Sequence, residues 1–331
     1  MPELISCRVL ARFVRMCPRS ARFHYTFSEA DILDAGFLAI ETALKTIHEH
    51  KDDPEYLELR WNPKLKKNLL KIDEFAQTAA EAALKVRLPD AVEIRGEESS
   101  LEDLTYRLEV AALLDMVDGT DLLERGLWNW CSAMVLFNRQ QVWASLIGMP
   151  NREIYYERFS EAGAFVREPR KAESAPQIQT VTVKEKPDIR LQDASIAFYG
   201  QKPKSLLTTV RHGGLAKALD QIAQEAQAKR DQPDAPKFRI YNLAGNPMMM
   251  QLIEGKIDAV IELSGQRCHD VIPGFAIALK AGAKLFDWET RNEITTKDLP
   301  NMLASPKNKF KYVMACNEQL AVEIVDVLNG A

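Results

Sequence analysis

The spacing of apolar and polar residues predicts two amphipathic helices near the start of the chain. Apolar residues recur at helical spacing over residues 28–48 and again over 73–86. Ser28 stands directly before the acidic residues Glu29 and Asp31, an arrangement that is common where helices begin. We therefore expect a helix over each range, with Ser28 as the N-cap of the first.

Strand patterns dominate the next part of the chain. Short alternating runs predict strands from residue 92 to residue 165, with hairpin-like turns at Asn138-Arg139 and Asn151-Arg152. Residues 168–186 are rich in charged residues and Pro, which favours a loop or a domain junction. This junction marks the expected end of an α+β half of the molecule.

After the junction, helix and strand patterns alternate, which is typical of an α/β arrangement. The expected strands cover 194–198, 239–243 and 257–263, and the expected helices cover 214–228, 248–254 and 270–281. We divide the chain into a basic N-terminal segment (1–27), an α+β half (28–186) and an α/β half (187–331).

The composition excludes several classes of protein. The chain has 331 residues, of which 46% are hydrophobic and 27% charged, enough for one large or two medium cores. A net charge of −4 gives no indication of the basic surface that nucleic-acid binding requires. No stretch of about 18 apolar residues is present, so no membrane partner is expected. The five scattered cysteines form no metal-binding spacing and indicate a reducing compartment, for which we expect the cytoplasm.

The first 22 residues differ from the rest in their charge, because they contain five Arg residues and a single acidic residue, Glu3. Such a segment fits an organelle-targeting presequence, a short basic helix docked on the body, or an over-extended start of translation. The sequence leaves these three interpretations open.

The strongest candidate for chemistry is the run Asp115-Met116-Val117-Asp118-Gly119-Thr120. It follows the apolar residues 110–114, which predict a buried strand, so two carboxylates stand at a strand end. Carboxylates bind hard cations, and the backbone N–H groups of a glycine turn bind phosphate. Taken alone, the run equally fits an acidic turn that uses Asp and Gly for their backbone geometry.

Two further acidic features accompany this run. Upstream, Glu97 and Glu98 follow a short alternating stretch. Downstream, Asp270 opens a buried helix in which Pro273 is expected in the first turn, where no intrahelical N–H is needed. Each feature alone has a structural explanation: Asp270 as an N-cap and Glu97 as a loop acid.

Together, Gly-Glu-Glu at 96–98, Asp-x-x-Asp-Gly-Thr at 115–120 and Asp270 before a helix resemble, in this order, the inositol monophosphatase superfamily. This superfamily of magnesium-dependent phosphatases also contains fructose-1,6-bisphosphatases and nucleotide 3′-phosphatases. The resemblance extends to residues 71–76 and 244–259, and it covers roughly residues 30 to 325. It implies an α+β or α/β protein that folds as a layered αβαβα sandwich.

The sequence departs from the family pattern at positions between and beside the acids. Met116 replaces the usual Pro, His269 replaces the usual Trp, and Ile272-Pro273 replaces a pair of small residues. The metal-binding carboxylates of the family are all present.

The resemblance assigns roles to individual residues. Glu97 and Asp115 would hold a first metal with the Val117 carbonyl, and Asp115, Asp118 and Asp270 would hold a second. Two or three Mg²⁺ ions are implied as the cofactor. Thr120, with Asp73 behind it, would help to activate the attacking water, and the N–H groups of Gly119 and Thr120 would bind phosphate. Glu262 would bind a substrate hydroxyl. By its position, Asp73 also fits a first-turn helix acid.

Some prominent residues are not expected to act in catalysis. The side chains of the adjacent Cys268 and His269 should point in different directions, so we expect neither a metal ligand nor a nucleophile there. Met248-Met249-Met250 predicts helix core. Trp128 and Trp130 stand where the family has a loop near the substrate, but they alternate as in a strand, which favours core packing.

The predicted function is a magnesium-dependent hydrolase of a small phosphate ester. Phosphate monoesters hydrolyse very slowly unaided, and two metal ions about 3.5–4 Å apart can both activate water and hold the leaving oxygen. The expected substrate is an inositol monophosphate-like polyol or a sugar phosphate. The alternatives are a nucleotide 3′-phosphatase, a fructose-1,6-bisphosphatase, or a catalytically silent member that binds metal or phospholigand. The resemblance also favours a homodimer.

Overall fold

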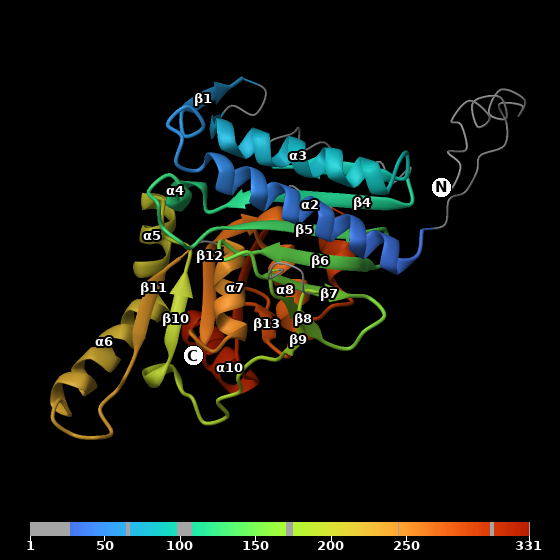
Figure 1. Cartoon of the computed structure of the whole chain (residues 1–331). Helices are drawn as coiled ribbons and strands as arrows, with labels where there is room; N and C mark the ends of the chain where they lie inside the picture. Colours follow the sequence, from blue (N-terminus) through green and yellow to red (C-terminus); the bar gives the residue numbers. More distant parts are fainter. Residues whose placement is uncertain are drawn as a thin grey trace, which may run out of the picture.

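The computed structural model describes residues 27–63, 67–97, 108–169, 175–243, 245–304 and 308–330. Residues 1–26 of the basic N-terminal segment and Glu98 lie outside these ranges, so the interpretations of them stay predictions. In the described part of the chain, two large sheets alternate with layers of helices (Figure 1).

The outermost layer is a pair of helices, α2 (Glu29–His50) and α3 (Lys71–Arg87), which confirms both helices expected in this region. Ser28 is the N-cap of α2: its Oγ accepts from the Asp31 N–H at 3.2 Å, and Asp31 accepts from the Ser28 N–H. The apolar faces of both helices pack on the first sheet (Figure 1). In the chain segment that connects α2 to α3, β1 (Leu59–Asn62) and β2 (Lys67–Leu70) form an antiparallel pair.

The first sheet runs in sequence order from β3 to β9. Its strands are β3 (Val92–Gly96), β4 (Val110–Asp118), β5 (Cys131–Phe137), β6 (Val142–Gly148), β7 (Ile154–Arg158), β8 (Ala164–Arg167) and β9 (Ile178–Val181). Only the β3–β4 pair is parallel. The prediction of a loop over 168–186 is wrong for β9, an edge strand whose mostly exposed residues leave no alternating apolar signal.

The second sheet has the order β11-β10-β12-β15-β13-β14. Its strands are β10 (Ser195–Phe198), β11 (Arg239–Asn242), β12 (Ala259–Arg267), β13 (Lys284–Asp287), β14 (Glu293–Ile294) and β15 (Lys309–Ala315). The first three strands are mutually parallel, and β15 is antiparallel to both β12 and β13. The first sheet ends before residue 187 and the second begins after it. The division into two halves at that point stays a prediction, since one apolar cluster includes residues of both sheets.

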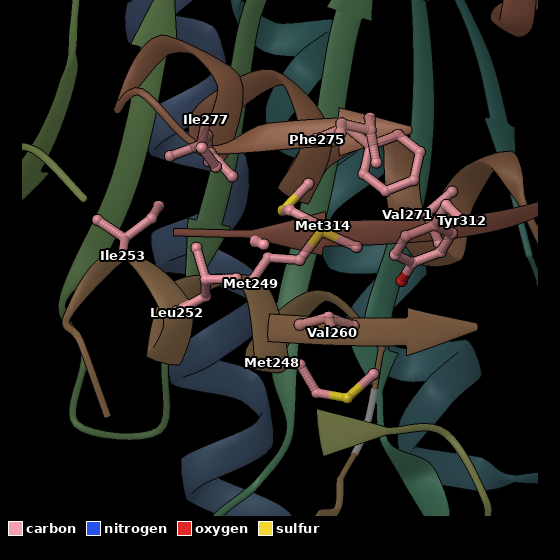
Figure 2. Close-up of a cluster of buried hydrophobic side chains, with 14 of the residues drawn as sticks. Met248, Met249, Leu252, Ile253, Val260, Val271, Phe275, Ile277, Tyr312 and Met314 are labelled. Carbon is pink, nitrogen blue, oxygen red and sulfur yellow. The ribbon is translucent and has the colours of Figure 1, made fainter. Parts of the chain in front are cut away.

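Helices α7 (Gly245–Ile253) and α8 (Cys268–Lys280) form the layer between the two sheets. Figure 2 shows that Met248 and Met249 of α7, Phe275 of α8 and Tyr312 of β15 belong to one buried cluster. All three methionines of the 248–250 run are fully buried, as their helix-core interpretation predicts. These central helices hold the residues that face the candidate site.

A last layer covers the far side of the second sheet, where α10 (Glu318–Leu328) packs on β13 and β15 and contacts α6. The remaining short or peripheral elements are α4 (Thr120–Leu123), η2 (Leu191–Asp193), α5 (Pro203–Val210), α6 (Gly213–Ala228) and α9 (Leu299–Leu303). The architecture is therefore the layered αβαβα sandwich that the sequence predicted.

Two further observations concern the described residues alone. None of their helices is long and apolar enough to cross a bilayer. Trp130 is buried, but Trp128 is 70% exposed, so the expectation of two core indoles is wrong for Trp128. Residues 127–130 form no strand, and strand alternation does not apply to them.

Candidate active site

A bulge in β4 turns the two aspartates of the Asp-x-x-Asp run toward the same side of the first sheet. In a regular strand, residues three apart point to opposite faces. The pairing of β4 with β5 shifts register between Asp115 and Asp118, and both carboxylates are buried. Both aspartates lie within electrostatic reach of Cys131. Burial raises the pKa of the Cys131 thiol, and the negative charges of Asp118 and Asp115 raise it further.

Asp118 is held by the first residues of α7. Its Oδ2 accepts from the Asn246 backbone N–H at 2.6 Å and from Asn246 Nδ2 at 3.0 Å. Burial raises the pKa of Asp118 to about 8, and the nearby Asp270 and Glu97 carboxylates add to the rise against the two hydrogen bonds. Ionisation of Asp118 therefore destabilises the folded protein unless a positive charge binds in the cluster.

Pro273 interrupts the hydrogen bonding of α8 and Asn246 closes the gap. Pro273 lies inside the helix rather than in its first turn, which corrects the sequence-based expectation. It has no N–H to donate to the carbonyl of His269, four residues earlier. Asn246 Nδ2 donates to that carbonyl at 3.1 Å, and Asn246 Oδ1 accepts from the Gly274 N–H at 2.9 Å. One buried amide thus connects Asp118 to the start of α8.

Asp270 and Glu97 meet at the start of α8. Asp270 is the third residue of α8, and its Oδ2 accepts from the N–H of the N-cap residue Arg267 at 2.8 Å. The alternative that Asp270 is itself the N-cap is therefore wrong, although its carboxylate does stabilise the helix start. Glu97 follows β3, and its N–H donates to the Leu114 carbonyl at 3.0 Å, beside Asp115. Carboxylate oxygens of Glu97 and Asp270 and a ring nitrogen of His269 all lie within 4.8 Å of one another. Burial raises the pKa of Asp270, and Glu97 contributes to the rise.

Gly119 and Thr120 form the turn that follows these aspartates. Gly119 has φ of 96°, a left-handed conformation that suits glycine, and it is the N-cap of the short helix α4. The Thr120 hydroxyl lies 2.9 Å from the Val117 carbonyl and 3.3 Å from Asp73 Oδ1. Its single proton can be donated to only one of these acceptors at a time. Asp73 Oδ2 also accepts from the Leu70 N–H at 3.2 Å, so Asp73 caps α3 as well.

Glu262 lies on β12 just before a register shift in its pairing with β15. One oxygen, Oε1, accepts from the Ser264 N–H, the Ser264 hydroxyl and the Gly265 N–H at 2.6–2.7 Å. The other oxygen, Oε2, is buried without a hydrogen-bond partner among the described residues. Burial raises the pKa of Glu262, and the charge of Asp270 contributes, so the two carboxylates lie within electrostatic reach.

Three residues at this site were missed or dismissed at the level of the sequence: Asn246, His269 and Tyr199. Asn246 lies within the run 244–259 that takes part in the resemblance, but the sequence assigned it no role. Tyr199 gives no sequence signal. Burial and the charges of Asp270 and Asp118 raise its pKa, so its phenol lies near the acids. Only the tertiary structure brings Tyr199, which follows β10, toward β4 and α8.

The donor set fits a divalent cation of the Mg²⁺ kind. The carboxylates come from three separate segments, two of them have raised pKa values, and oxygen ligands are what hard cations prefer. A layered αβαβα sandwich with such a cluster at strand ends, beside a glycine turn, is typical of metal-dependent phosphatases.

Comparison with known proteins identifies the family. The chain belongs to the inositol monophosphatase family, whose model matches residues 38–321. Members of this family are generally magnesium-dependent. No curated protein matches the sequence significantly.

Solved structures share the fold at low sequence identity. An inositol monophosphatase from Thermotoga maritima is 16% identical with a TM-score of 0.64, over 91% of this chain and 97% of that one. The extragenic suppressor protein SuhB from Bartonella henselae is 17% identical with a TM-score of 0.64, over 90% and 98%. A dual specific inositol monophosphatase/NADP phosphatase, bound with D-inositol-1-phosphate, is 16% identical with a TM-score of 0.61, over 92% and 97%.

Proposed function

We propose that this protein is a magnesium-dependent phosphomonoesterase that hydrolyses an inositol monophosphate-like polyol or a sugar phosphate with a metal-activated water. The observation that carries the proposal is the cluster of Asp118, Asp270 and Glu97, drawn together from β4, α8 and the end of β3. Packing like charges in a buried site is unfavourable without a cation, so a site of this kind indicates one.

The proposed ligands follow the segments of the site. Glu97, Asp115 and the Val117 carbonyl would hold one cation, and Asp115, Asp118 and Asp270 would hold another. Bound Mg²⁺ would supply the charge that neutralises the phosphoryl oxygens and acidifies water. The backbone N–H groups of Gly119 and Thr120 would bind the phosphate oxygens, since the left-handed glycine opens the turn for close approach.

Thr120 and Asp73 are the proposed proton acceptors. The Thr120 hydroxyl can donate to Asp73 Oδ1 and then offers a lone pair to a neighbouring water. Because Asp73 Oδ2 is fixed by the Leu70 N–H, the carboxylate is oriented before substrate arrives. A geometry of this kind fits a base that orients the attacking water.

Glu262 is the proposed contact for a substrate hydroxyl. Three donors fix Oε1, while Oε2 is a buried acceptor without a partner among the described residues, which a substrate hydroxyl that reached it would satisfy. A polyol or sugar supplies the hydroxyl donors that such an oxygen needs. The structural relative that holds D-inositol-1-phosphate supports a polyol phosphate. The same relative is described as an NADP phosphatase, so a nucleotide phosphate is the second candidate substrate.

Phosphate release from a panel of phosphomonoesters tests the proposal. The panel should contain inositol monophosphates, sugar phosphates, fructose 1,6-bisphosphate and nucleotide phosphates, each with Mg²⁺, with Ca²⁺ and with excess chelator. We expect turnover with Mg²⁺ only, since Ca²⁺ is larger and holds its ligands in looser geometry. Turnover in excess chelator would refute the metal mechanism, and no turnover with tight Mg²⁺ binding would indicate a silent member.

We further propose a homodimer located in the cytoplasm. Multi-angle light scattering of the purified protein measures the first, and imaging of the tagged full chain in its own cells measures the second. The buried thiols of Cys131, Cys268 and Cys316, none of them in a disulfide, are compatible with a reducing compartment.

A further inference from the structure

His269 is a buried imidazole inside the candidate metal site. Its side chain is only 2% exposed, and its Nε2 lies 3.4 Å from Asp270 Oδ1. The other ring nitrogen, Nδ1, is buried and has no hydrogen-bond partner among the described residues. A ring nitrogen of His269 also lies within 4.8 Å of both the Glu97 and the Asp270 ligand oxygens. The imidazole is therefore placed within the acid cluster.

The local structure separates His269 from its neighbour Cys268. Cys268 Sγ lies 3.4 Å from the Met302 carbonyl, toward α9, and burial raises the pKa of its thiol to about 12. The expectation that the Cys268 and His269 side chains point in different directions agrees with this contact. The conclusion that neither of them takes part in a metal site does not follow for His269.

The distances suit ligands of a single cation. Two neighbouring ligands with metal bonds of about 2.1 Å lie about 3 Å apart in octahedral geometry, and opposite ligands lie about 4.2 Å apart. The 3.4 Å between His269 Nε2 and Asp270 Oδ1 is close to the separation of two neighbouring ligands.

We propose that His269 supplies a nitrogen ligand to the cation that Asp270 would hold, beside Glu97, and that this position takes a divalent first-row transition metal such as Mn²⁺ in preference to Mg²⁺. Imidazole nitrogen binds transition metals well, whereas Mg²⁺ takes oxygen ligands. This inference rests on the proposed metal-dependent function and concerns the same site. The Trp that the family pattern has at this position could not bind a metal in this way, so the preference would be particular to His269.

Pulsed electron paramagnetic resonance of the full chain loaded with Mn²⁺ tests the assignment. A directly bound imidazole gives nitrogen-14 modulation of the Mn²⁺ echo, which we expect in the wild type and in His212→Gln. His212 is the matched control because it packs on Trp288 and is not one of the clustered residues. In His269→Gln the modulation should disappear. By titration calorimetry, the Mn²⁺ affinity of His269→Gln should fall about tenfold or more, with a smaller change for Mg²⁺.

Each outcome distinguishes this inference from the proposed function. Tight Mn²⁺ binding without nitrogen modulation would overturn the His269 assignment and leave the metal-dependent function standing. Absence of binding of either ion would overturn both. If His269→Gln does not fold, histidine-selective nitrogen-15 labelling of the wild type provides the test, because bound imidazole must then show nitrogen-15 lines. A labelled spectrum without such lines would also refute the proposal.

Discussion

At the scale of single residues, the candidate site contains groups that have a structural role as well as a proposed chemical one. Asp270 stabilises the start of α8 and Asp73 that of α3, yet each also faces the candidate site. Asn246 uses both ends of its amide and its backbone N–H to join Asp118 to α8. A structural explanation for such a residue therefore does not exclude a functional one.

Asp115→Asn should abolish turnover and leave the fold intact. The proposed bridging carboxylate neutralises two cations, so its loss weakens both sites, and we expect kcat/KM to fall about 1,000-fold or more, equivalent to about 4 kcal/mol. Fewer crowded negative charges should keep or raise the thermal stability of the metal-free protein. Steady-state kinetics and calorimetry measure both effects. Asp188→Asn, at an exposed loop position, is the control, and a comparable loss there would contradict the assignment.

Asn246→Ala should impair stability and metal binding together. It leaves the His269 carbonyl and the Gly274 N–H without their buried amide partner, at a cost of about 1–3 kcal/mol each at most. Asp118 loses one of its two hydrogen bonds and should bind Mg²⁺ more weakly. Urea unfolding and Mg²⁺ titration provide the measurements. Unchanged Mg²⁺ affinity in a destabilised variant would show that Asn246 supports the helix alone.

At the scale of elements, the candidate site residues lie at irregular positions in a strand and a helix. The bulge in β4 brings Asp115 and Asp118 to one face, and Pro273 in α8 leaves a carbonyl that Asn246 uses. Regular elements form the layers around them, but their buried faces also enclose charged residues that are not part of the candidate site, and Glu157 is one of these. Glu157 of β7 is 2% exposed, and its Oε1 has no hydrogen-bond partner among the described residues.

Glu157→Gln should stabilise the protein more at pH 8 than at pH 5. Burial raises the pKa of Glu157 to about 7 from 4.5, although nearby Lys280 opposes the rise. The folded state thus holds a proton that the unfolded state releases, so the wild type loses stability as pH rises from about 4.5 to about 7. The full effect is about 3 kcal/mol. Urea unfolding at both pH values measures it, and exposed Glu185→Gln should show no such difference.

At the scale of the whole molecule, metal binding, protonation and folding are linked. The acids that would bind metal come from β3, β4 and α8, so they meet only when the layers are assembled. In the metal-free protein their raised pKa values favour protonated forms, and a cation must displace those protons. The order of layers thus determines both the site and its pH dependence.

The rise in melting temperature caused by saturating Mg²⁺ should be larger at pH 8 than at pH 5.5. The pKa of Asp118 is raised to about 8 from 3.8, so its ionisation destabilises the metal-free fold progressively as pH rises through that window. Bound Mg²⁺ offsets this loss, and its affinity falls when the acids are protonated. Differential scanning fluorimetry measures the shift, and calorimetry in buffers of different ionisation enthalpy should show proton release. An equal shift at both pH values would contradict this linkage.

Much of the fold was predictable because its signals are local. Ser28 and Asp31 predict the start of α2, and the apolar residues of β4 and α8 predict buried elements. β9 was not predicted, because an exposed edge strand needs no apolar face and therefore leaves no alternating pattern in the sequence. Trp128 was predicted wrongly because alternation has no meaning outside a strand.

The sequence by itself determined the family, the order of the elements and which acidic residues are candidates for the site, because motifs and periodicity are properties of neighbouring residues. The tertiary structure alone decided that Asn246 joins Asp118 to α8 and that Tyr199 lies near the acids. It also decided that His269 lies among the candidate ligands. Such contacts depend on a bulge, a proline and the packing of separate layers, and the direction of a side chain in space is fixed only when those layers meet.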